Sequence, residues 1–150
     1  WGIANSLHVM SMAHGLIGLP SRSSSYRKGA VSWHPNGSVF TGAGISIRQI
    51  PFAYHADWGS TGRWWVEIDT RESSYRFCPL EKLFRRVSCA GQWEEVPLVA
   101  FDANVKAGFV EQVASMLSSE LRAHVSLMNL EQTAALTQFG EDVFGYSGEK

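Results

Sequence analysis

The chain has 150 residues, a length that indicates one ordinary domain. It is 45% hydrophobic and 18% charged, a balance that can bury a core and excludes a disordered chain. Thirteen Lys and Arg against fourteen Asp and Glu give a formal charge of -1, so no basic excess indicates a nucleic-acid-binding protein. The longest uncharged stretch, between Gly2 and Arg22, is too polar for a helix that spans a membrane.

The first residue is Trp1 rather than Met, so we expect the sequence to be processed or to be a piece of a longer protein. No secretory signal pattern is present. Two cysteines, Cys78 and Cys89, do not make a disulfide scaffold in a chain of this length. We therefore predict free thiols in a reducing compartment, which favours a cytoplasmic protein.

The first zone, residues 1–20, is predicted to be a short helix. Apolar and aromatic side chains recur there at near-helical spacing, at Leu7, Met10, His14 and Ile17. Asn5 is predicted to cap the start of this helix, and Gly18 and Pro20 are predicted to end it.

The middle zone, about residues 26–98, is predicted to consist of strands. Segments 28–34 and 37–48 are separated by a turn signal at Asn36-Gly37. The preceding serine-rich segment, Ser21 to Ser25, is predicted to be a polar loop.

The clearest hairpin in the sequence joins residues 52–58 to residues 64–68. Apolar and polar side chains alternate on both sides of a Gly-containing turn at 59–62. Two further short strands are expected, at 75–77 and 93–96.

The last zone is predicted to be helical. Its apolar residues Phe109, Val113, Met116 and Leu117 fit one helix face. Residues 129–132 resemble a capping box that opens a second helix, which Gly145 would end. The order of one helix, about five or six strands and two helices predicts an α+β fold. In it, helices cover one face of an antiparallel sheet.

Trp65 stands out on the outward face of the predicted hairpin. A large aromatic side chain on a solvated face is costly unless something covers it. Either a loop of this chain or a second subunit would cover it, and the sequence favours neither. His55 and Asp57 lie two residues apart on a strand, so they face one side as a surface pair or as an interface contact.

His8 is the residue best placed for chemistry, because Asn5 lies one turn before it on the same face of the predicted helix. Imidazole can act as acid, base or hydrogen-bond donor near neutral pH, although a lone histidine on an amphipathic helix is more often structural than functional. His8 and His14 are six residues apart and do not share a face, so no metal site is predicted. The dinucleotide-binding fingerprint needs G-x-G-x-x-G between a strand and a helix, whereas Gly42-Ala43-Gly44 continues into a predicted strand. The sequence therefore contains no cofactor-binding motif.

Five segments follow one another in order along nearly the whole chain: residues 1–9 (WGIANSLHV), 52–59 (FAYHADWG), 62–67 (GRWWVE), 76–83 (RFCPLEKL) and 106–113 (KAGFVEQV). This ordered set resembles the C-terminal domain of the Gfo/Idh/MocA oxidoreductases, the relatives of glucose–fructose oxidoreductase and inositol dehydrogenase. The resemblance implies that a Rossmann-type domain that binds NAD or NADP precedes this domain and is missing from the chain. It also implies an open, mostly antiparallel sheet with helices on one face and the other face free for oligomerisation. A homo-oligomer would form through that free face, with His55, Trp65 and Glu67 as interface residues.

The resemblance also assigns roles on the first helix. His8 matches the family's helix histidine, which lies beside substrate and nicotinamide and relays a proton during hydride transfer to or from a sugar-like hydroxyl. Asn5 matches an Asn-Ser-x-His form and would bind substrate. Ala4 stands where many members carry Asp, and Ser11 stands where others carry an acidic residue.

Two functions are therefore open. In the first, residues 1–150 are the substrate-binding and oligomerisation domain of an NAD(P)-dependent oxidoreductase acting on a sugar or polyol, inactive alone. In the second, the chain is a stand-alone binding or assembly protein that kept this fold without catalysis. The absence of a cofactor motif, and Ala4 in place of an acidic residue, would be expected of such a protein.

Overall fold

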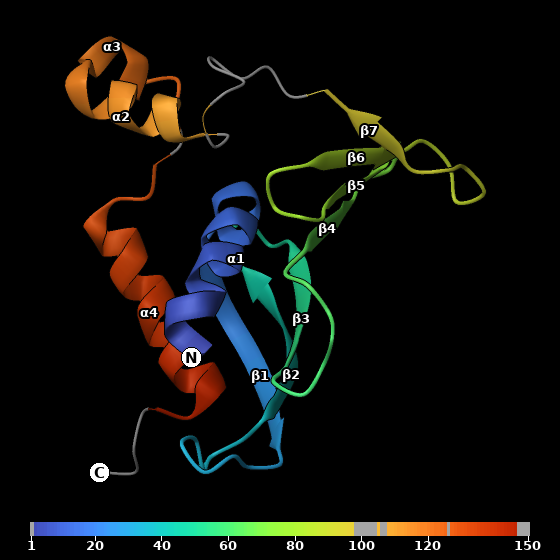
Figure 1. Cartoon of the computed structure of the whole chain (residues 1–150), viewed down its shortest axis with the longest axis vertical. Helices are drawn as coiled ribbons and strands as arrows, with labels where there is room; N and C mark the ends of the chain where they lie inside the picture. Colours follow the sequence, from blue (N-terminus) through green and yellow to red (C-terminus); the bar gives the residue numbers. More distant parts are fainter. Residues whose placement is uncertain (1, 98–104, 106–107, 126, 147–150) are drawn as a thin grey trace. The chain divides into compact units, whose positions relative to one another are not determined.

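The computed structural model describes residues 2–97, 105, 108–125 and 127–146 (Figure 1). These residues form helices and two open antiparallel sheets, so the predicted α+β class is confirmed. The chain divides into two units, Trp1–Gly62 with Met128–Lys150, and Arg63–Leu127. The expectation that residues 1–150 form one domain stays a prediction.

The first unit contains α1 (Gly2–Ile17), and the predicted N-terminal helix is thus confirmed. The helix ends at Gly18, whose φ is 89° and whose N–H donates to the carbonyl of His14 at 2.9 Å. The prediction that Asn5 caps the helix is wrong, because helical residues begin at Gly2. Gly2 lies directly against the Phe144 ring, and this packing stabilises a first turn that local capping signals do not reveal.

The helix α4 (Leu130–Phe144) begins at the predicted capping box. The Asn129 side chain accepts from the Gln132 N–H at 2.8 Å, and the Gln132 side chain accepts from the Asn129 N–H at 2.9 Å. Both bonds satisfy amides at a helix start that have no partner within the helix. Gly145 ends α4 with a φ of 70°, as predicted.

Three strands form the sheet of the first unit, in the order β1 (Pro20–Lys28), β2 (Val39–Ser46) and β3 (Pro51–Asp57). The polar loop predicted at Ser21 to Ser25 is wrong, because these residues belong to β1, and all of them but Ser21 pair with β2. The strand predicted at 28–34 is also wrong, since Val31 and His34 form only an isolated bridge. The hydrogen bonds between strands are made by the backbone and need no apolar side chains, so the serines show no strand pattern in the sequence.

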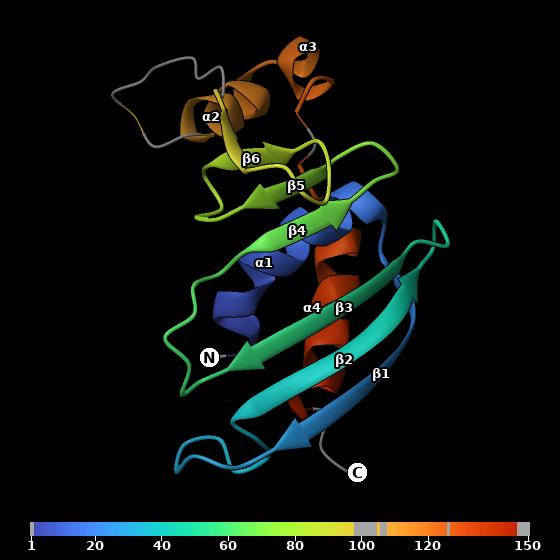
Figure 2. The same ribbon diagram turned by 90° about the vertical axis from the view of Figure 1, so that its right-hand side faces the viewer.

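Both helices of the first unit lie on one face of its sheet (Figure 2). Phe40 of β2 is fully buried, and its ring centroid lies 4.9 Å from that of Phe144. Tyr54 of β3 packs its ring against Phe139 of α4. The core therefore lies between this sheet and α1 and α4, and the opposite sheet face is left without a helix in the described part of this unit.

The second unit holds a four-stranded sheet and two helices: β4 (Val66–Asp69), β5 (Ser74–Phe77), β6 (Leu83–Arg86), β7 (Glu94–Val96), α2 (Phe109–Leu117) and α3 (Ser119–Arg122). The strands predicted at 75–77 and 93–96 and the helix starting at Phe109 are confirmed. The described strands divide between two sheets, whereas one sheet of about five or six was predicted.

The hairpin predicted from residues 52–58 and 64–68 is wrong. β3 pairs with β2, and β4 pairs with β5. Residues 58–65 lie outside any strand, and this connection is longer than the roughly two to five residues of a typical hairpin loop.

Candidate functional site

The helix α1 has an inner face that holds it in place. Gly2 lies against the Phe144 ring, and the Ile3 and Met10 side chains lie next to Gly140 of α4. At the other end of the helix, the imidazole of His14 is buried between the rings of Phe52 and Phe139, with centroid distances of 5.0 and 5.7 Å.

His14 is bonded as well as buried. Its Nδ1 donates to the carbonyl oxygen of Gly18 at 2.8 Å, so the bond fixes the Nδ1–H tautomer. Burial lowers the pKa of His14 below its ordinary value, and the hydrogen bond to Gly18 opposes this shift only in part. His14 is therefore a neutral structural histidine at neutral pH.

His8 lies on the other side of α1. Its side chain is exposed, while Asn5, one turn earlier, is half-buried. Residues three apart share a helix face, so the structure brings the Asn5 amide and the His8 imidazole to the same side of α1. The Ser11 hydroxyl donates to the carbonyl oxygen of His8 at 3.0 Å. An amide and an imidazole on a fixed helix can bind and exchange protons with a small hydroxylated ligand.

His55 lies on the face of the three-stranded sheet that α1 and α4 leave open. Tyr26 pairs with Thr41, and Thr41 pairs with His55, so the three form one row across the outer face. One oxygen of the Asp57 carboxylate is already hydrogen-bonded, because Oδ1 accepts from the Gly59 N–H at 2.8 Å. The exposed His55 side chain is thus presented on this outer face, beside Thr41 of the central strand.

Trp65 and Glu67 belong to the second unit, and Arg76 links them. The Glu67 carboxylate accepts from Arg76 Nη2 at 2.6 Å and from Nε at 2.7 Å. The same guanidinium lies over the Trp65 ring at 5.9 Å and over the Trp93 ring at 4.3 Å. Trp65 is 53% exposed, so within the described part of the chain no loop buries it.

Two side chains with notable contacts were not predicted from the sequence. Arg76 is one, because its contact with Glu67 depends on the register of β4 against β5. The other is Tyr54, whose hydroxyl lies 2.6 Å from the Ser25 hydroxyl. Burial raises the pKa of Tyr54 above its ordinary value, while the Ser25 hydrogen bond and the charge of Arg27 partly offset the effect.

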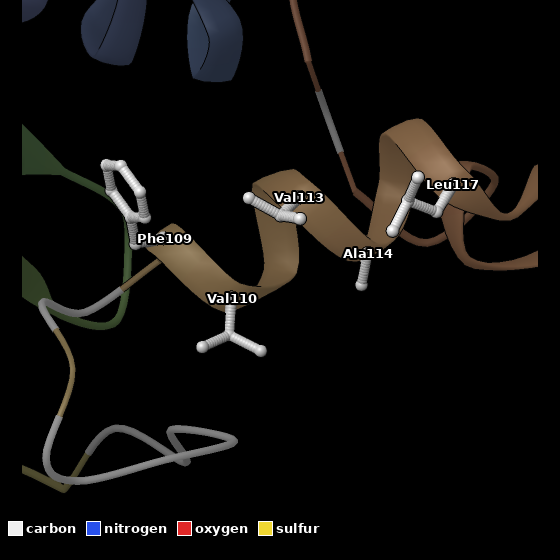
Figure 3. A pocket seen from close by; sticks show the side chains of 5 residues that line it. All are labelled: Phe109, Val110, Val113, Ala114 and Leu117. Atoms are coloured by element: carbon white, nitrogen blue, oxygen red, sulfur yellow. The ribbon is translucent and has the colours of Figure 1, made fainter.

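An open hollow lies along α2, lined by apolar side chains of that helix alone: Phe109, Val110, Val113, Ala114 and Leu117 (Figure 3). It offers no titratable group and therefore no chemistry. No cluster of three or more potential metal ligands occurs among the described residues.

Comparison of the chain with models of protein families finds no match, and comparison with curated proteins finds none either. Among the helices in the described ranges, none is long and apolar enough to cross a membrane.

Proposed function

We propose that the chain is the substrate-binding and oligomerisation part of an NAD(P)-dependent oxidoreductase that acts on a sugar or polyol hydroxyl in the cytoplasm. One observation carries the proposal. The inner face of α1 is anchored by Gly2, Met10 and His14, while Asn5 and His8 lie one turn apart on the side away from that core.

The chemistry follows from these two side chains. The Asn5 amide can both donate to and accept from a polyol hydroxyl, which orients the substrate on the helix. The His8 imidazole takes the proton of the reacting hydroxyl during oxidation, or returns it during reduction. Because α1 is fixed by packing, the backbone positions that carry the two groups do not have to be ordered at the moment of reaction.

The cofactor does not fit the residues that the structure describes. A dinucleotide site needs glycines in a loop before a helix, where backbone amides can approach phosphates. Gly42 and Gly44 instead lie within β2, close to β1 carbonyls and to the rings of Tyr54 and Phe52. We therefore assign NAD or NADP to a Rossmann-type domain outside these residues.

The oligomerisation part of the proposal rests on two exposed surfaces. His55 lies on the uncovered face of the three-stranded sheet, and Trp65 with the Glu67–Arg76 ion pair lies on the four-stranded sheet. Exposed tryptophan and arginine side chains such as Trp65 and Arg76 are residue types enriched in protein interfaces. A second copy of this chain would bury them.

The alternative is a binding or assembly protein without catalysis, which the absence of an acidic residue at Ala4 favours. The test compares the 150-residue chain with the longest open reading frame that contains it. Both proteins are purified and assayed for NAD(P)H formation with a panel of sugars and polyols. We expect turnover only from a longer protein with an N-terminal dinucleotide domain. A reading frame that starts just before Trp1, with no turnover, would establish the alternative.

The residue test uses His8→Gln in the active protein, with His124→Gln as the matched control. His8→Gln is expected to lower turnover about a hundredfold or more, as expected for loss of a general acid–base group, with no change in melting temperature. His124 is exposed in the second unit, and its replacement should change neither quantity. If His8→Gln lowers the melting temperature together with the turnover, the loss of turnover follows from unfolding and contradicts the catalytic role. Tight binding of NADH to the isolated 150 residues, followed by fluorescence, would contradict the assignment of the cofactor elsewhere.

A further inference from the structure

The strand β1 is one edge of the three-stranded sheet, because only β2 pairs with it. Within the described part of the chain, no other backbone hydrogen bond reaches residues 21–27. The amides and carbonyls along the outer edge of this nine-residue strand are thus open to another extended chain. Every residue from Ser21 to Lys28 is exposed, so nothing described covers this edge.

The charge of this edge is entirely positive. Arg22, Arg27 and Lys28 are its charged residues, and none of them forms an ion pair with a described carboxylate. Arg27 lies beside Gly145, at the C-terminal end of α4, where a cation complements the helix dipole. Arg22 and Lys28 share the outer face of the strand with Tyr26, so they remain as two cations at opposite ends of one stripe.

A second copy of β1 is a poor partner for this edge. Pairing two copies would bring together two sets of Arg22, Arg27 and Lys28 with no carboxylate on either strand. Like charges brought together on paired strands are destabilising. The serines between them are small and would not obstruct a different strand.

We propose that β1 binds an extended acidic peptide segment of a partner protein, which adds a fourth strand to this sheet. Backbone hydrogen bonds along Ser21–Lys28 hold the segment, as in strand addition by other peptide-binding domains. Carboxylates of the segment on the outer face pair with Arg22 and Lys28. This binding site is separate from the His8 side of α1, and the proposal does not depend on the proposed enzyme activity.

The test is a titration of the isotope-labelled 150-residue chain, followed through its backbone amide resonances. The probe is a nine-residue peptide of alternating threonine and glutamate, and the comparison peptide carries lysine in place of glutamate. We expect the glutamate peptide to shift the amides of Ser21–Lys28 first, and added salt to weaken the binding. The lysine peptide should leave these amides unchanged.

The variant Arg22→Glu/Lys28→Glu should weaken binding of the glutamate peptide roughly tenfold or more and gain binding of the lysine peptide. Both side chains are exposed, so the variant should keep its melting temperature. The matched control is Arg63→Glu/Arg71→Glu, which changes the net charge equally within the second unit and should bind as the unmodified chain does. Three results would overturn the proposal: no shift along β1 at millimolar peptide, equal binding of both peptides, or an equal loss in the control. Concentration-dependent broadening of the β1 amides without peptide would also overturn it, since a second copy would then be the occupant.

Discussion

The buried His14 predicts that the first unit loses stability as the pH falls. In the folded chain the pKa of His14 lies below its ordinary value of 6.5, because burial disfavours the charged imidazole. The unfolded chain therefore binds more protons than the folded chain at pH values just below 6.5. It follows that the free energy of unfolding decreases as the pH falls from 6.5 towards the folded pKa, and that the contribution of His14 levels off below it.

Both the pH dependence due to His14 and the stability lost when its side chain is removed can be bounded. One titrating group changes the free energy of unfolding by at most about 1.4 kcal/mol per pH unit. At pH 8, His14→Ala removes the bond to Gly18, worth about 1 kcal/mol, and two edge-to-face ring contacts of about 0.5–1.5 kcal/mol each. We expect a loss of roughly 3 kcal/mol, which is a large share of the stability of an ordinary domain.

The assay is urea unfolding of the 150-residue chain at pH values from 8 to 5, with His8→Ala as the control. The exposed His8 should cost less than about 0.5 kcal/mol when replaced. His14→Leu keeps an apolar side chain of similar size and should remove the part of the pH dependence due to His14. If His14→Leu and the unmodified chain lose stability in parallel between pH 6.5 and 5, the assignment of the pH dependence to His14 is refuted.

Two further predictions concern the helix start and the interface. Asn129→Ala removes the cap of α4 and should lower the free energy of unfolding in urea by about 1 kcal/mol. Gln138→Ala, at an exposed position of the same helix, should lower it little. Equal losses in the two variants would show that the Asn129 cap does not stabilise the helix. Trp65→Ala should weaken self-association by roughly 2 kcal/mol, about thirtyfold, as measured by sedimentation, while Trp64→Ala, at 47% exposure, should leave it unchanged. An unchanged sedimentation profile for Trp65→Ala would count against the proposed interface.

The helices could be predicted because their signals are local. The apolar stripe from Phe109 to Leu117 and the capping box at Asn129 lie within one or two turns of the elements that they specify. The fold class follows from the order of such elements. The same reasoning placed Asn5 and His8 on one side of α1, because helix spacing alone decides it.

The strand pairing could not be predicted, because alternation tells which face a residue takes but not which strand lies beside it. Residues 52–58 alternate as expected, yet their partner is β2 and not the segment that follows. The contact of Glu67 with Arg76 depends on the same missing register, as does that of Tyr54 with Ser25. Ser21–Ser25 gave no strand pattern at all, since β1 is held by its backbone.

The two histidines of α1 differ in burial, as the sequence pattern that placed His14 among the apolar residues of the helix predicts. His14 and His8 lie on one helix, but only His14 packs against Phe52 and Phe139. We expect protonation of His14 to weaken this packing of α1, the helix that also carries Asn5 and His8. If the proposed enzyme loses turnover between pH 6.5 and 5 through this packing, His14→Leu should retain turnover over the same range. An equal fall of turnover in His14→Leu and in the unmodified protein would show that the state of His14 does not act on the proposed site.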